Sequence, residues 1–125
     1  MRVIVPVDGG RDCREAIKFI ASKKDWFEHE KPEVELVYVQ KPVVDRVTEQ
    51  GEFNLKAYYE ATAKAVWAGM REEIEAIPMQ VKQTSLVGHP AQLIPEYANE
   101  QRADLIVMGA VSYTHLRAHE TLRHL

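Results

Sequence analysis

Histidines near the C-terminus are the first residues whose type and spacing suggest chemistry. The chain ends VSYTHLRAHETLRHL, where His115 and His119 would share one face of a helix, with Glu120 beside them and His124 further on. A His-x3-His pair is a plausible pair of first ligands for zinc. By residue type alone, this segment is a candidate metal site.

Two acidic residues, a histidine and a cysteine are the other candidates for chemistry. Asp8 and Asp12 lie on either side of a Gly-Gly pair, and His89 lies in a Gly-His-Pro turn, where we expect a turn or capping role. No spacing arranges these residues as acid, base and nucleophile, so we do not expect catalysis. Cys13 is the single cysteine, which excludes an internal disulfide and favours a small, partly buried helix residue.

The composition excludes several functional classes. A chain of 125 residues with 46% apolar residues predicts one soluble globular domain. The net charge of −3 comes without a basic block, which argues against nucleic acid or an acidic membrane as a partner. The apolar runs are far shorter than the roughly 20 residues of a membrane span, and the N-terminus lacks a long apolar signal region. We therefore expect a cytoplasmic protein with small-molecule or protein partners.

The elements that must position these residues follow from the apolar pattern. Short apolar runs, rich in β-branched residues or alternating, predict four strands. They cover Arg2 to Val7, Val34 to Val39, Met79 to Val87 and Ala103 to Met108. Helical spacing predicts three helices between them. They cover Asp12 to about Lys23, Phe53 to about Ile77, and Pro90 to about Asn99.

Two details of the predicted helices depend on single residues. Asp12 is expected to cap the first helix, and Pro90 takes the favoured first position of the third. Pro95 lies inside the third helix, where it lacks a backbone donor, so we expect an irregularity near Ala91. A longer loop is predicted from Gln40 to about Glu52.

Apolar strands that alternate with amphipathic helices predict an α/β fold with an open, doubly wound parallel sheet. In such sheets, ligands bind beyond the carboxyl ends of the strands, close to the place where the strand order reverses. The residues expected at those ends are Asp8, Gly9, Val39, Gln40, Gly88 and Gly109.

Three segments carry a resemblance to a known family. Val5-Pro-Val-Asp-Gly9, Gly88-His-Pro-Ala91 and Ala103-Asp-Leu-Ile-Val-Met-Gly109 together resemble the universal stress protein family over residues 1–109. The resemblance implies a Rossmann-like five-stranded parallel sheet of order 3-2-1-4-5, a homodimer and a role in stress response. Some members bind ATP and others bind no nucleotide, and the sequence leaves both alternatives open for the intact parent.

The resemblance also implies a nucleotide site. Its ATP-binding members use an aspartate after strand one, backbone groups at the end of strand two, and a Gly-x2-Gly-x9-Gly-Ser/Thr segment after strand four. In this chain the implied nucleotide-binding residues are Pro6, Val7, Asp8, Val39, Met108 and Gly109. After Gly109 the pattern stops, because Ser112 and Tyr113 follow in place of the further glycines. Those glycines would let backbone donors approach phosphate oxygens.

A different resemblance accounts for the segment that follows. Residues 111–121, VSYTHLRAHET, resemble at every position the translation of a transposon-type sequencing-library adaptor. We therefore expect a universal stress protein domain over residues 1–110 that lacks its fifth strand and last helix, which leaves the order 3-2-1-4, and a non-native tail over 111–125. Such a segment is excluded from the reasoning on fold and function. The tail histidines then hold no native metal, and this chain is expected to have low stability and to bind ATP weakly at most.

One enzymatic alternative remains. Asp8-Gly-Gly-Arg-Asp-Cys13 resembles the Ser-Gly-Gly-x-Asp-Ser pyrophosphate loop of ATP pyrophosphatases, which have a related fold. Aspartate and cysteine replace both serines here, and no substrate domain follows. The main hypothesis is a non-catalytic, nucleotide-sensing stress-response domain, and the alternative is an adenylating enzyme.

Overall fold

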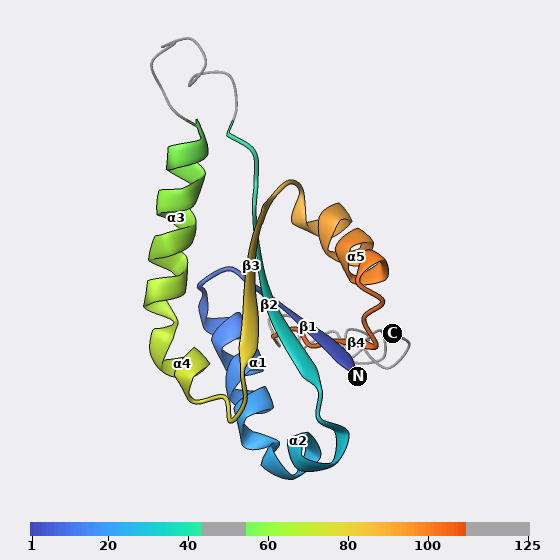
Figure 1. Cartoon of the computed structure of the whole chain (residues 1–125). Coiled ribbons are helices and arrows are strands. Elements are labelled where there is room, and N and C mark those ends of the chain that lie inside the picture. Colours follow the sequence, from blue (N-terminus) through green and yellow to red (C-terminus); the bar gives the residue numbers. More distant parts are fainter. Residues whose placement is uncertain (44–54, 110–125) are drawn as a thin grey trace.

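The computed structural model describes residues 1–43 and 55–109 (Figure 1). Most of the loop predicted from Gln40 to Glu52 lies outside these residues, and so does the C-terminal segment with its three histidines. Within the two described ranges, no helix is long and apolar enough to cross a membrane.

Four parallel strands form one sheet with the order β3-β2-β1-β4, which confirms the order predicted from the sequence. The strands are β1 (Arg2–Val7), β2 (Glu33–Gln40), β3 (Val81–Val87) and β4 (Leu105–Ile106). β1 and β2 pair from Arg2 opposite Glu33 to Val7 opposite Tyr38. They are central and mostly apolar, with Glu35 as the one charged residue between Val34 and Val39, as expected for strands that are covered on both faces.

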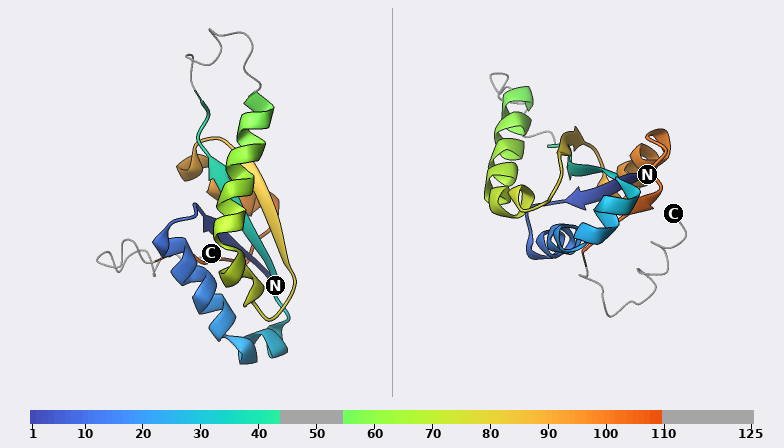
Figure 2. Two further views of the ribbon diagram at one scale, coloured as in Figure 1. Left: turned by 90° about the vertical axis from the view of Figure 1, so that its left-hand side faces the viewer. Right: turned by 60° about the horizontal axis from the view of Figure 1, so that its bottom comes forward.

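Helices cover both faces of this sheet (Figure 2). They are α1 (Arg11–Ser22), α2 (Lys24–Glu30), α3 (Leu55–Gly69), α4 (Arg71–Glu75) and α5 (Pro90–Glu100). One buried cluster joins Val3, Val5 and Val7 to residues of α1, α3 and α4, whereas Ile4 packs in a second cluster with Ala98 of α5. Alternate residues of β1 therefore face opposite layers, and the sheet is doubly wound.

The structure corrects several predicted bounds. The charged segment after α1 forms the short helix α2, which the sequence pattern did not predict. The long predicted second helix is two helices, because the chain leaves helical geometry at Met70 with φ −108° and ψ 10°. Met70 is fully buried in the core, and α4 begins immediately after it. β4 is also shorter than predicted, with only Leu105–Ile106 in strand geometry.

Two predictions about single helix residues have different outcomes. Asp12 is not the cap of α1, because the helix begins at Arg11 and Gly10 occupies the cap position. The carboxylate of Asp12 lies in the first turn, where a negative charge still suits the helix dipole. α5 begins with Pro90 as predicted and continues through Pro95. The missing amide donor of Pro95 is tolerated there because Ala91 is exposed, so that water can reach its carbonyl group.

Candidate functional site

The carboxyl ends of β1 and β4 meet at the place where the strand order reverses. From β1 the chain continues into α1 on one face of the sheet, whereas α5, which precedes β4, covers the other face. In open α/β sheets the usual ligand position is the space beyond the ends of two such neighbouring strands, whose helices lie on opposite faces. This space beyond the ends of β1 and β4 is called the crevice. The sequence-predicted residues Pro6 to Asp8 and Met108 to Gly109 lie at these two ends.

The loop after β1 is shaped by its own backbone and by Asp8. The exposed Asp8 carboxylate accepts a hydrogen bond from the Gly10 amide at 2.8 Å. Gly9 has φ +82°, and a Cβ placed on it would lie 3.3 Å from Val66 Cγ1 of α3. A side chain at Gly9 would be strained by this backbone conformation and crowded by α3. The loop therefore turns sharply into α1 and keeps Asp8 at the rim of the crevice.

Arg14 connects the same loop to α4 through a hydrogen bond and an ion pair. Its Nε donates to the Gly9 carbonyl at 3.3 Å, and its Nη1 lies 3.4 Å from Glu73 Oε2. Both side chains of this ion pair are partly buried, at 35% and 18% exposure. This contact could not be predicted from the sequence, because Arg14 and Glu73 are far apart in the chain and each resembles an ordinary surface residue of an amphipathic helix.

Val39 contributes backbone to the crevice. Its side chain is buried, and its neighbour Gln40 accepts a hydrogen bond from the Gly88 amide at 2.9 Å on the β3 side. Consecutive residues of a strand direct their backbone groups to opposite sides, so those of Val39 point toward β1. The ladder between β1 and β2 ends at Val7 opposite Tyr38. The Val39 carbonyl therefore faces the space beyond the end of β1.

Met108 and Gly109 complete the edge of the crevice. The pairing of β4 with β1 continues to Val107, whose amide donates to the Ile4 carbonyl at 2.9 Å. Met108 then exposes 52% of its surface. Gly109 approaches the first turn of α1 so closely that a Cβ on it would lie 2.0 Å from the Asp12 carbonyl oxygen. The end of β4 thus meets the start of α1 beside the loop that holds Asp8.

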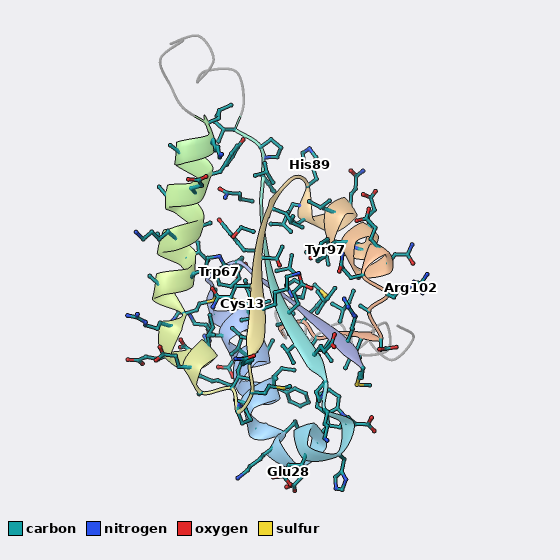
Figure 3. All side chains as sticks on the ribbon, viewed as in Figure 1. Cys13, Glu28, Trp67, His89, Tyr97 and Arg102 are labelled. Atoms are coloured by element: carbon teal, nitrogen blue, oxygen red, sulfur yellow. The ribbon has the colours of Figure 1, made fainter. Side chains whose placement is uncertain are left out.

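The remaining two sequence-predicted residues lie within β1 itself, at its last two positions. Val7 is buried in the core, and Pro6 is partly buried opposite Val37 in the β1–β2 register. His89 lies elsewhere, exposed at the cap position of α5 with no capping hydrogen bond from its side chain (Figure 3). The structure thus brings together the residues at the ends of β1 and β4, with Val39 on the adjacent strand, and leaves His89 apart.

Cys13 lies directly beneath this loop but is not placed for nucleophilic chemistry. Only 5% of the residue is exposed, its Sγ donates to the Gly10 carbonyl at 3.3 Å, and Met70 Sδ lies 3.7 Å away. Burial raises the pKa of the thiol, with the nearby Asp8 carboxylate adding to the shift. A thiol held in its protonated form is a poor nucleophile.

Alkylation kinetics test this position of Cys13. Iodoacetamide at pH 8 should modify the folded chain at least about tenfold more slowly than the same chain in urea, because both burial and the raised pKa reduce the accessible thiolate. Mass spectrometry follows the single modification, and a free cysteine-containing peptide provides the reference rate. Equal rates in buffer and in urea would contradict this account.

A cavity of about 730 Å³ lies next to the crevice, between α3 and the carboxyl ends of β2 and β3. Its walls include Gln40, Tyr59 and Trp67, and the indole of Trp67 donates to Ser85 Oγ at 2.9 Å. Gln40 is one of the residues expected at the strand ends, but none of the six implied nucleotide-binding residues lines this cavity. The helical pattern of 53–77 does not predict a hollow beside Tyr59, which arises from the packing of α3 on the sheet. Across residues 1–43 and 55–109, no group of three or more His, Cys, Asp or Glu residues is arranged to hold a metal ion.

Comparison with protein families and with solved structures gives consistent results. The sequence model of the universal stress protein family matches residues 1–119. The match extends beyond residue 110, the boundary expected from the adaptor resemblance. No curated protein sequence matches the chain.

Three solved structures illustrate the structural similarity. Hypothetical protein MJ0577 is 26% identical with a TM-score of 0.68, and the alignment covers 94% of this chain and 79% of that one. A universal stress protein in complex with cAMP is 17% identical with a TM-score of 0.68, covering 98% and 84%. A universal stress protein family protein from Arabidopsis thaliana with AMP bound is 14% identical with a TM-score of 0.62, covering 94% and 81%.

Proposed function

Because the chain belongs to the universal stress protein family, we propose that its intact parent is a non-catalytic stress-response domain that senses adenine nucleotides. The proposed ligand site is the crevice between the ends of β1 and β4, formed by Pro6, Val7, Asp8, Val39, Met108 and Gly109. Two of the structurally similar proteins contain cAMP and AMP, which supports an adenine nucleotide as the ligand class. We further propose a cytoplasmic homodimer for the parent.

The observation that carries this proposal is that the ends of β1, β2 and β4 meet at one crevice. Asp8 presents an exposed carboxylate at one rim, and the Val39 carbonyl faces the same space from β2. A carboxylate suits ribose hydroxyls, whereas a free backbone carbonyl suits an amino group on a base. A site for ATP also requires backbone amide donors that bind the phosphate oxygens.

We propose that the segment supplying those donors is missing from this chain. The residues after Gly109 lack the second and third glycines of the family's phosphate-binding segment, and residues 111–121 resemble a translated adaptor. On this proposal, residues 111–125 are a non-native tail, and this chain binds ATP weakly at most. The genomic sequence of the parent should therefore continue after Gly109 with Gly-x2-Gly-x9-Gly-Ser/Thr.

Calorimetry on two chains tests the function. A chain in which the genomic continuation replaces residues 111–125 should bind ATP about 100-fold more tightly than the present chain, since two or more charge-assisted hydrogen bonds to phosphate are added. Asp8→Ala in the continued chain should weaken ATP binding about tenfold, whereas Asp25→Ala in the first turn of α2, at the other end of the molecule, should not. A genomic continuation without the glycines, or equal ATP affinity of both chains, would refute the proposal.

The adenylating alternative has a different product. An ATP pyrophosphatase would release pyrophosphate, whereas a nucleotide sensor returns ATP unchanged. A coupled pyrophosphate assay on the continued chain should remain at background. Sustained pyrophosphate release that Asp8→Ala abolishes would favour the enzyme instead.

A further inference from the structure

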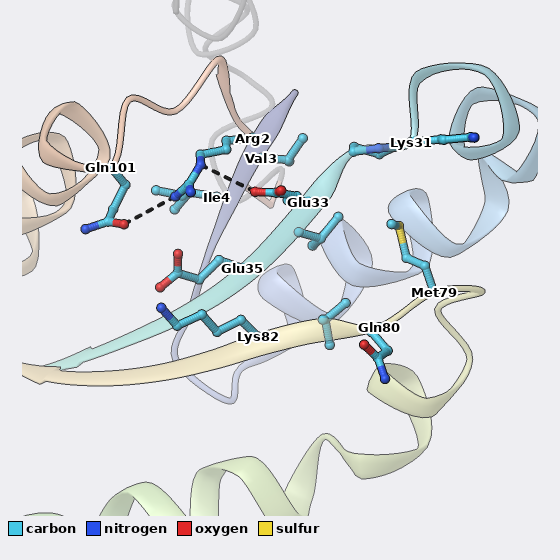
Figure 4. Close-up of a pocket in the computed structure, with 13 residues that line it drawn as sticks. Arg2, Val3, Ile4, Lys31, Glu33, Glu35, Met79, Gln80, Lys82 and Gln101 are labelled. Carbon is cyan, nitrogen blue, oxygen red and sulfur yellow. Dashed lines mark hydrogen bonds and ion pairs between the residues drawn. The ribbon is translucent and has the colours of Figure 1, made fainter.

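A second cavity lies at the opposite end of the sheet from the nucleotide crevice. It has a volume of about 490 Å³ and is formed at the amino ends of β1, β2 and β3 (Figure 4). Its polar lining residues include Arg2, Lys31, Glu33, Glu35, Lys82 and Gln101. The proposed function uses none of these residues.

Glu35 is the unusual feature of this cavity. It lies in the middle of an otherwise apolar strand and is only 8% exposed. An ionised carboxylate in such a place needs hydrogen-bond donors, because burial without them is costly. Two hydroxyl groups supply them: Thr84 Oγ1 donates to Glu35 Oε2 at 2.6 Å, and the Tyr97 hydroxyl donates to the same oxygen.

Tyr97 is well suited to remain a donor. It lies on the side of α5 that faces the sheet (Figure 3), and burial raises the pKa of its hydroxyl, with the hydrogen bond to Glu35 adding to the shift. The phenol therefore stays protonated across the physiological range. The Thr84 and Tyr97 hydroxyls together fix the Glu35 carboxylate in one orientation.

The second oxygen of this carboxylate remains available. Within residues 1–43 and 55–109, both hydrogen bonds of the Glu35 side chain end on Oε2, and none ends on Oε1. Among the described residues, no side-chain nitrogen or oxygen atom is buried without a hydrogen-bond partner. Oε1 therefore keeps contact with the open space of the cavity, where it can accept a hydrogen bond from a bound molecule.

Lys82 is the positively charged neighbour of Glu35 on the adjacent strand. It pairs with Glu35 in the β2–β3 register, and Figure 4 shows its ammonium group extending along the same wall as the carboxylate. Among the ion pairs within residues 1–43 and 55–109, none involves Lys82. Arg2 differs, because its guanidinium already contacts Glu33 and Gln101, each at 3.4 Å. On the wall that carries Glu35, the cavity thus offers one oriented acceptor and one cation outside these ion pairs. Lys31 also lines the cavity, and Figure 4 shows its side chain extending away from Glu35.

We propose that this cavity binds a free amino acid, with the ligand's ammonium group on Glu35 Oε1 and its carboxylate on Lys82. The pair of opposite charges formed by Glu35 and Lys82 matches an amphoteric ligand better than a simple anion, which the neighbouring Glu35 carboxylate would repel. A purely apolar ligand would cover the Glu35 carboxylate without offering it a donor, which is costly. The cavity has room for a short aliphatic side chain, which Ile4 would contact on the face of the sheet that carries Glu35.

Three probes of similar length test whether binding requires the ammonium group of the ligand, its carboxylate, or both. Isothermal titration calorimetry of the full chain uses norleucine, pentylamine, which lacks the carboxylate, and hexanoate, which lacks the ammonium group. Norleucine should bind about tenfold more tightly than either, the expectation for one additional hydrogen bond between charged groups. ATP should leave the affinity for norleucine unchanged, which separates this site from the nucleotide crevice.

Two variants test which cavity residue binds the ammonium group of the ligand and which binds its carboxylate. Lys82→Met should remove the advantage of norleucine over pentylamine, and Glu35→Gln should remove its advantage over hexanoate. The glutamine keeps an oxygen for the Thr84 and Tyr97 hydroxyls, so the fold should survive, as thermal melting by circular dichroism will verify. Lys41→Met, an exposed lysine outside the cavity, is the matched control and should bind norleucine like the unmodified chain. No norleucine binding by the folded chain, equal binding of hexanoate, or insensitivity to both cavity variants would overturn the proposal.

Discussion

Ile17→Ala should lower the free energy of unfolding by about 2–5 kcal/mol. Ile17 lies in the middle of α1 with no exposed surface, in the cluster that joins α1 to Val3 and Val5 of β1. The substitution removes buried carbon atoms and leaves a void that the surrounding strands cannot fill without moving. Urea unfolding followed by circular dichroism measures the change. A loss of this size would leave little net stability in a single domain.

Phe19→Ala on the same helix is the matched control. Phe19 is 51% exposed, and its ring lies 5.0 Å below the Lys23 ammonium group on the outer side of α1. Removing this ring should cost less than about 1 kcal/mol, mostly the weak cation–π contact. The comparison holds helix and measurement constant and varies only burial. Equal losses from the two substitutions would show that α1 does not pack on the sheet through Ile17.

The strands could be predicted from the sequence because the central sheet is covered on both faces. The run Arg2 to Val7 matches β1 in every residue, and the run Val34 to Val39 lies within β2. Consecutive apolar residues leave no alternative to burial on two sides. The strand order followed from the family resemblance, since the apolar pattern alone does not say which strands are neighbours.

The helix boundaries depended on information that the local pattern lacks. The helical periodicity of 53–77 continues through Met70, although the helix does not. Met70 N–H donates to the Trp67 carbonyl at 3.1 Å, which closes a tighter turn and redirects the chain, and the Met70 side chain then fills the core next to Cys13. Apolar spacing cannot distinguish a straight helix from two helices whose apolar sides still face the same core.

The crevice and the cavity beside Glu35 differed in how far the sequence could predict them. The crevice at the strand ends followed from fold class and resemblance, because strand ends are recognised as the places where apolar runs stop. The cavity beside Glu35 did not. A single glutamate inside an apolar run gives no sign of partners, and its donors Thr84 and Tyr97 come from β3 and α5, far along the chain. Only the assembled sheet and helix bring these three side chains together.

Gly109→Ala should lower the free energy of unfolding by about 2–3 kcal/mol. A Cβ at this position would lie 2.0 Å from the carbonyl oxygen and 2.3 Å from the carbonyl carbon of Asp12. These are backbone atoms in the first turn of α1, so relief requires that the helix or the end of β4 move. Thermal and urea unfolding of the variant measure the loss.

Gly69→Ala is the control for the Gly109 substitution. Gly69 is the last residue of α3, and a Cβ there would lie an ordinary 3.6 Å from Arg14 Nη2, so the change should stay below about 1 kcal/mol. A similar small effect at Gly109 would mean that β4 and α1 do not meet as described.

A large effect of Gly109→Ala on stability would mean that packing alone requires glycine at the rim of the crevice. Weaker nucleotide binding by a Gly109 variant of the continued chain would then result from a displaced α1. Contacts with the ligand should therefore be tested at Asp8 and Val39 rather than at Gly109.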